Sequence, residues 1–246
     1  MRSPPSMVVF DENNSLLKTL TFEQPTPMLA TQLVRDPNLW NRSWVIEQLG
    51  RRTGDSLALA ALARAARNAD YYRVRAEAAL ALGSFPGEVA IPSLEAALRD
   101  TSATVRDAAV TALGTIGGDK ARTLVLAAWK RDSSYQVRAT ALTAVSGIDS
   151  AGSKELVRVG LGTPSYRDVI QTAAIAAAVQ APDSAIVDGL EKILGNQRNA
   201  AIALATLARR GDNRALAALV RHKNDNRAWV RRWVVDAIDQ QLEKTP

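Results

Sequence analysis

The stretch at residues 71–83, YYRVRAEAALALG, returns twice in altered form along this chain of 246 residues. Its copies are ATVRDAAVTALG at 103–114 and YQVRATALTAVS at 135–146. The Val-Arg pair begins at positions 74, 105 and 137, so the period is 31 and then 32 residues. A fixed period in this range is typical of stacked repeats, in which each unit buries its apolar face only against its neighbours. The sequence therefore predicts an all-α superhelix built from helix pairs.

The positions of proline and glycine divide residues 25–246 into about seven such pairs. Pro25 and Pro27 suit the first turn of a helix, because the missing N–H has no intrahelical partner there. Gly50, Gly83 and Gly114 stand at or near the ends of second helices, where glycine terminates a helix without strain. The expected pairs are 25–36 with 39–50, 54–68 with 71–83, 87–99 with 103–115, 118–131 with 134–146, 150–161 with 165–179, 182–194 with 196–210, and 212–222 with 226–242.

Residues 1–24 differ from the repeats. The run 7–10 is apolar and β-branched, 11–14 supplies turn residues, and 15–22 alternates as a second strand would. We expect a short N-terminal pair of β-strands here, as the edge of a β domain, followed by a repeat domain at 25–246. Because two strands alone are marginally stable, the pair should belong to a sheet outside this chain or fold onto the first helices.

Composition argues against several functional classes. The chain contains no cysteine, which excludes a disulfide scaffold and any thiolate metal site. His222 is the only histidine, so neither a histidine-based zinc site nor a Ser-His-Asp relay can be assembled. We therefore expect no catalytic residue, no metal and no cofactor, and we expect that this chain by itself is not an enzyme.

Hydropathy predicts no membrane partner. No window approaches the roughly 18 apolar residues of a membrane-spanning helix. Pro4 and Pro5 interrupt the segment in which an export signal needs a continuous apolar run. We expect a cytoplasmic protein.

The sequence pattern of residues 100–114 resembles that of HEAT repeats, especially the short bacterial kind of phycobilisome-lyase-like proteins. In this pattern an Asp is followed by Val-Arg, then by Ala, and then by Ala-Leu-Gly. The resemblance covers residues 25 to about 242, and the signatures of tetratricopeptide and ankyrin repeats are missing. It implies a ladder in which the turn Asp and the second-helix Arg connect successive units. By motif match, the ladder residues are Asp70, Arg75, Asp100, Arg106, Asp132 and Arg138. The fifth unit has Tyr166-Arg167-Asp168-Val169 instead, so the ladder should be altered there.

The arginines of the second helices allow two interpretations. A net charge of +6 permits a basic face for nucleic acid or an acidic protein partner, and the candidate residues for such a face are Arg73, Arg167, Arg227 and Arg231. Acidic residues such as Glu77 and Asp107 are interleaved with them, however. We therefore favour a solvated or ladder role for these arginines. The five tryptophans stand at helical spacings among apolar residues, which predicts core packing and not base stacking.

A more specific resemblance comes from residues 8–23, the Asp36-Pro37 step and 44–50. Together they are similar to the end of the small β domain and the start of the helical C-terminal domain in bacterial zinc aminopeptidases of the aminopeptidase N family, and 163–169 is also similar to that domain. The resemblance implies a helical domain that covers a peptidase active site. The His-Glu-x-x-His and Gly-x-Met-Glu-Asn motifs of that family are absent here, so the chain should be catalytically silent alone.

Two hypotheses follow. The first is a non-catalytic scaffold that packs on another protein, such as a zinc-peptidase catalytic domain. The second is a basic solenoid that binds nucleic acid or an acidic protein.

Overall fold

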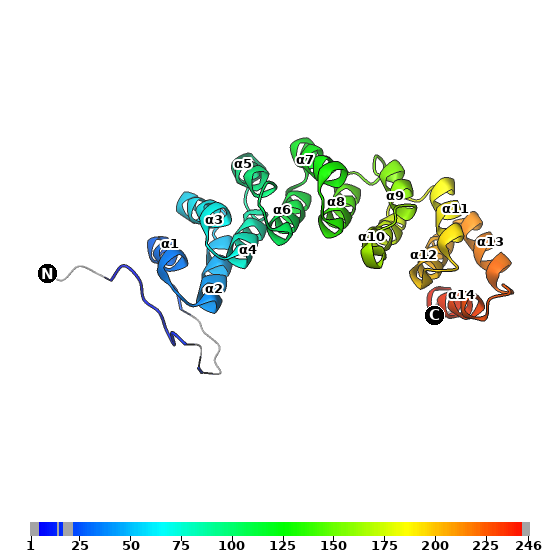
Figure 1. Cartoon of the computed structure of the whole chain (residues 1–246), viewed down its shortest axis with the longest axis horizontal. Coiled ribbons are helices and arrows are strands. Elements are labelled where there is room, and N and C mark those ends of the chain that lie inside the picture. The colour runs from blue at the N-terminus through cyan, green and yellow to red at the C-terminus, as the bar shows by residue number, and fades with distance from the viewer. Residues whose placement is uncertain (1–4, 14, 17–21, 243–246) are drawn as a thin grey trace. The chain divides into compact units, whose positions relative to one another are not determined.

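The computed structural model describes residues 5–13, 15–16 and 22–242, and over these residues it contains fourteen α-helices, one 3-10 turn and no strand (Figure 1). The helices form the seven predicted pairs, with boundaries close to those expected. They group into two compact units, one ending at Ala128 and the other beginning at Trp129. None of the described helices is both long enough and apolar enough to cross a membrane.

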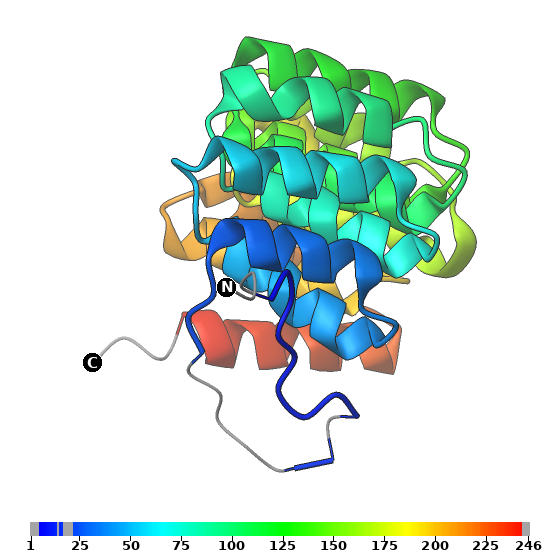
Figure 2. The same ribbon diagram turned by 90° about the vertical axis from the view of Figure 1, so that its left-hand side faces the viewer.

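The first unit arranges its helices in two rows. One row contains α1, α3 and α5, and the other contains α2, α4 and α6 (Figures 1 and 2). α7 (Gly118–Arg131) follows and contains the boundary between the units. The helices of the two rows are α1 (Thr26–Arg35), α2 (Leu39–Gly50), α3 (Ser56–Asn68), α4 (Tyr72–Leu82), α5 (Gly87–Ala97) and α6 (Ala103–Ile116).

Alanine and leucine build the core of this unit. Leu49, Leu82 and Leu113 are completely buried, one on the second helix of each of three successive pairs. Small residues let the second helices approach closely: a Cβ added at Gly83 would lie 3.0 Å from the Cα of Ala112. This close approach explains why the repeat ends in Ala-Leu-Gly, since a larger residue at the glycine position would push α4 and α6 apart.

The turn within a pair is closed by one recurring arrangement, Asp followed by Arg six residues later. The Asp carboxylate accepts the backbone N–H two residues on, as in Ser102 N to Asp100 Oδ1 at 2.8 Å. The Arg guanidinium then donates to the Asp carbonyl oxygen, as in Arg106 Nη1 to Asp100 O at 2.9 Å. These bonds satisfy polar groups that a helix end leaves unpaired. The turns showing both bonds are Asp36 with Arg42, Asp100 with Arg106, and Asp225 with Arg231.

The expected strand at residues 7–10 is wrong, because no described residue there is in a strand. Side chains of the first helical region bind the backbone of this segment instead: Gln24 Nε2 donates to Val8 O at 3.2 Å, and Asn38 Nδ2 donates to Glu12 O at 2.8 Å. Asp11, at a φ of 51°, accepts the backbone N–H groups of Ser15 and Leu16. These contacts connect the segment to residues that precede α1 and α2. Most of the second expected strand, residues 17–21, lies outside the described residues.

The second unit also forms two rows. α8, α10, α12 and α14 follow one another in one row, and α9, α11 and α13 in the other. The fifth pair is irregular, because a 3-10 turn at Tyr166–Asp168 precedes α10 and both Arg167 and Asp168 have positive φ. The helices are α8 (Tyr135–Ile148), α9 (Lys154–Leu161), α10 (Val169–Ala178), α11 (Ser184–Ile193), α12 (Arg198–Arg209), α13 (Asn213–His222) and α14 (Ala228–Gln241).

Gly160 lets α9 approach its neighbours closely. A Cβ at this position would lie 2.5 Å from Leu142 Cδ1 and 2.9 Å from Ala174 Cβ. We expect Gly160→Ala to lower the free energy of unfolding by about 1–3 kcal/mol, because the two neighbours must move. Gly147→Ala in α8 is the matched control: nothing lies within 4 Å of its added Cβ, so it should raise that free energy by about 0.5–1 kcal/mol. Urea unfolding of both variants checks this, and shifts of the same sign would contradict it.

Candidate functional site

Arg75 and Asp100 form an ion pair between successive helix pairs of the first unit. Arg75 Nε lies 2.7 Å from Asp100 Oδ2, and Nη2 lies 3.1 Å from Oδ1, which is a two-pronged contact. Only 15% of the Arg75 side chain and 11% of the Asp100 side chain are exposed. Arg75 Nη1 also donates to the carbonyl oxygen of Ala69 at 2.9 Å. The arginine thereby connects its own turn to the turn of the next pair.

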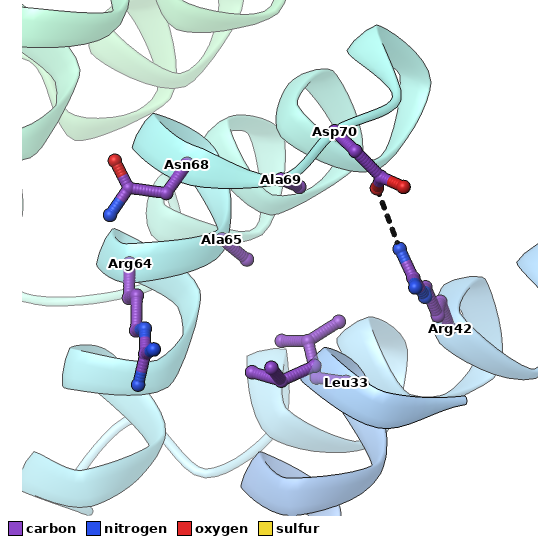
Figure 3. Close-up of a pocket in the computed structure, with 8 residues that line it drawn as sticks. Leu33, Arg42, Arg64, Ala65, Asn68, Ala69 and Asp70 are labelled. Atoms are coloured by element: carbon purple, nitrogen blue, oxygen red, sulfur yellow. Dashed lines mark hydrogen bonds and ion pairs between the residues drawn. The ribbon is translucent and has the colours of Figure 1, made fainter. Parts of the chain in front are cut away.

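Arg42 makes an equivalent contact that the motif match missed. Its Nη1 lies 2.9 Å from Asp70 Oδ1, as the dashed line in Figure 3 shows. The hydrogen bond from Arg42 and the backbone N–H of Tyr71 lower the pKa of Asp70. The signal was present in the sequence: Asp36 precedes Arg42 by six residues, the same spacing as Asp100 and Arg106, but the Val-Arg pair is missing there.

The other ladder candidates also make hydrogen bonds within their own helix pairs. Arg106 reaches the carbonyl oxygen of Asp100, as described above. Arg138 Nε donates to Trp129 O at 3.1 Å, and its guanidinium lies 5.0 Å from the centroid of the Trp129 ring. Asp132 Oδ1 accepts the backbone N–H of Ser134 at 2.8 Å. In the altered fifth unit, Asp168 Oδ2 accepts a hydrogen bond from Gln197 Nε2.

The four arginines of the candidate binding face have different surroundings. Arg73 lies in the first unit, is exposed and makes no hydrogen bond or ion pair with any described residue. The other three lie in the second unit. Arg167 lies over the ring of Tyr166, whereas Arg227 and Arg231 both bind Asp225, by its carboxylate and its carbonyl oxygen respectively.

Between the first turns of α2 and α4 lies a groove of about 170 Å³, which we call the α2–α4 groove. Trp40 is its most exposed large apolar residue, with 78% of its surface accessible. Leu39 and Val74 provide apolar walls, and Ser43 Oγ donates to the carboxylate of Glu77 at 2.6 Å. The residues lining the groove are Leu39, Trp40, Ser43, Tyr71, Arg73, Val74 and Glu77.

The exposure of Trp40 corrects the prediction that the tryptophans pack in the core. Trp129 is buried as expected, but Trp229 is 52% exposed and donates its indole N–H to the carbonyl oxygen of Gly195. In α2, Val45 and Leu49 occupy the buried face, and Trp40 lies on the opposite side of the helix. Helical spacing alone does not distinguish these faces when both contain apolar residues.

The α2–α4 groove has the composition of a protein-binding hot spot. Tryptophan, tyrosine and arginine are the residues enriched at such sites, and all three are present. Tyr71 and Tyr72 lie with ring centroids 4.9 Å apart. The groove also offers a free guanidinium at Arg73 and a carboxylate at Glu77, so it can pair with groups of either sign. No cluster of three or more potential metal ligands exists among the described residues.

Comparison with known proteins identifies the repeat. The sequence pattern of HEAT repeats matches residues 26–114 and 92–178. A comparison with curated proteins finds no match. The fold is similar to a chain of the CpcE–CpcF complex of phycocyanin lyase from Nostoc sp. PCC7120, with 21% identity, a TM-score of 0.53, and coverage of 93% of this chain and 99% of that one.

A second similar structure is YibA of Escherichia coli, with 21% identity, a TM-score of 0.60, and coverage of 87% of this chain and 86% of that one. At this identity both structures inform the fold alone. The family match extends over more than half of the sequence and includes two of the Asp and Arg turns, Asp36 with Arg42 and Asp100 with Arg106. The chain therefore belongs to the HEAT-repeat family.

Proposed function

We propose that this chain is a non-catalytic scaffold that binds another protein through the α2–α4 groove. The observation that carries the proposal is Trp40, a large side chain that is 78% exposed at a groove with apolar walls. Covering such a tryptophan is worth roughly 3 kcal/mol before the costs of association. The neighbouring Arg73 and Glu77 supply the polar rim that gives a protein interface its specificity.

The partner that we propose is the catalytic domain of a zinc aminopeptidase of the aminopeptidase N family. The support for this choice is the resemblance of residues 8–23, 44–50 and 163–169 to the helical C-terminal domain of those enzymes. The N-terminal segment adds to it, because Phe10 and Leu16 are 51% and 59% exposed there and offer apolar contacts to a neighbouring domain. In this arrangement the repeats limit access to an active site that the partner supplies.

The test mixes this chain with a bacterial aminopeptidase N lacking its own helical C-terminal domain. We expect saturable binding and a change in the turnover of a dipeptide substrate. We expect Trp40→Ala to weaken binding by about 10- to 30-fold, because it removes the central aromatic anchor. Isothermal titration calorimetry measures the affinity.

Trp229→Ala is the matched control, since it removes another half-exposed tryptophan and should change affinity by less than about twofold. Equal losses in the two variants would contradict a role for the groove. A complete lack of binding at high micromolar concentration would eliminate the peptidase as the partner.

A basic face for nucleic acid or an acidic protein is the alternative, and it has weaker support. Arg227 is held by the carboxylate of Asp225, and Arg231 by its carbonyl oxygen. The hydrogen bonds from Arg227 and His222 keep the pKa of Asp225 well below its usual range, so this carboxylate stays ionised beside the arginines. Salt-sensitive DNA binding that is lost in Arg73→Glu would be the observation in favour of this alternative.

A further inference from the structure

A second hollow lies in the first unit, between the C-terminal halves of α1 and α3, and we call it the α1–α3 hollow (Figure 3). Its volume is about 250 Å³. This is slightly below the usual range for small-molecule pockets, roughly 300–1,000 Å³, and suits one or two side chains of a partner. The lining residues are Leu33, Val34, Arg42, Arg64, Ala65, Asn68, Ala69 and Asp70.

The floor of the α1–α3 hollow is apolar. Leu33 is buried, whereas its neighbour Val34 is 51% exposed. On the α3 side the residues are Ala65 and Ala69, whose small side chains leave the space open. An exposed branched side chain beside open space favours contact with another apolar group.

The two polar walls differ in charge balance. On one side, Arg42 and Asp70 form an ion pair at 2.9 Å, so their charges offset each other. On the other side, Arg64 and Asn68 lie one turn apart on α3, and neither makes a hydrogen bond or ion pair with any described residue. Figure 3 shows Arg64 and Asn68 on the side of the hollow opposite the Arg42–Asp70 pair. The uncompensated charge of the α1–α3 hollow is therefore the guanidinium of Arg64.

We propose that the α1–α3 hollow binds an acidic residue of an extended partner segment, together with an adjacent apolar residue. The carboxylate pairs with the fork of N–H donors on Arg64, which matches carboxylate geometry. The apolar neighbour lies on Val34 and Leu33. Charge complementarity with Arg64 determines that the ligand carries a negative charge. The apolar floor favours a peptide over nucleic acid, because nucleic acid needs several clustered cations.

This inference does not depend on the α2–α4 groove, which is lined by other residues. Either site could fail its test while the other passes. Trp40→Ala should leave binding at the α1–α3 hollow unchanged, and this variant separates the two proposals.

The probe is a fluorescently labelled, acetylated pentapeptide amide, Ala-Leu-Asp-Leu-Ala, and its partner with Asn in place of Asp. Anisotropy titrations with the full chain measure affinity. We expect the Asp peptide to bind about tenfold more tightly than the Asn peptide. Arg64→Gln should remove this preference, so that both peptides bind with the weaker affinity. Arg64→Lys, which keeps the charge and loses the fork, should retain only part of it.

Arg67→Gln is the matched control, because Arg67 is also exposed on α3 and makes no side-chain hydrogen bond or ion pair with any described residue, yet does not line the hollow. It should change the affinity by less than about twofold. Equal losses in Arg64→Gln and Arg67→Gln would show unspecific charge attraction and overturn the proposal. No saturable binding of the Asp peptide up to millimolar concentration would overturn it too, and so would N-acetyl-leucine binding as tightly as the peptide.

Discussion

Leu82→Ala is expected to lower the free energy of unfolding by about 2–5 kcal/mol, the range for removing a completely buried leucine from a packed core. Leu82 has no exposed surface and lies on α4, within the stretch 71–83 that predicts the fold. Its loss leaves a cavity between neighbouring helix pairs, and each pair depends on the next for its burial. Chemical denaturation followed by circular dichroism measures the change.

The same helix provides the control. Leu80 is only two residues away from Leu82 and has the same side chain, but it is 49% exposed. Leu80→Ala should change the free energy of unfolding by less than about 1 kcal/mol, because little buried surface is lost. If both variants were equally destabilised, the assignment of the buried face of α4 would be wrong.

Asp100→Ala is expected to lower the free energy of unfolding by about 2–3 kcal/mol. The substitution removes both hydrogen bonds from Arg75 and the bond from Ser102 N, and it leaves Arg75 largely buried without its carboxylate. Breaking a fully buried ion pair costs about 3–5 kcal/mol of stability. Because both side chains of the Arg75–Asp100 pair are slightly exposed, we expect a smaller loss for this pair. A double-mutant cycle with Arg75→Met measures the interaction free energy between Arg75 and Asp100.

The effect of Asp100 should depend on pH. Burial raises its pKa, but the hydrogen bonds from Arg75 and from Ser102 N outweigh burial, so the pKa is lowered in the folded state. The stabilisation is therefore complete above the unfolded pKa, about 4, and is lost as the pH falls through the folded pKa. The difference between wild type and Asp100→Ala should be largest near pH 7 and should shrink in acid. A difference that does not change with pH would contradict an ionised partner for Arg75.

The repeats were predictable because their information is local and periodic. The Val-Arg spacing and the glycines set the helix pairs, and the structure has those pairs with small shifts at their ends. The expected strand at 7–10 failed for a different reason. The backbone of this segment is bound by the side chains of Gln24 and Asn38, 16 and 26 residues away from their acceptors, and no local pattern contains such contacts.

The candidate site was less predictable than the fold. The sequence placed Trp40 in the core, since a helical stripe of apolar residues does not reveal which of two faces meets a neighbour. Arg73 was singled out as a surface cation, but its position beside Trp40 and Glu77 depends on how α2 and α4 pack. Arg42 was missed because the motif relied on Val-Arg, although its distance from Asp36 carried the same information.

The Asp and Arg that close three of the turns within pairs also have a consequence for how this chain can change in evolution. A guanidinium that must reach the carbonyl oxygen six residues earlier fixes the number of residues in the turn. An insertion between Asp100 and Arg106 would separate these groups and also displace Asp100 from Arg75 of the preceding pair. Length variation among relatives should therefore be rare in these three turns and more frequent in the connections between pairs.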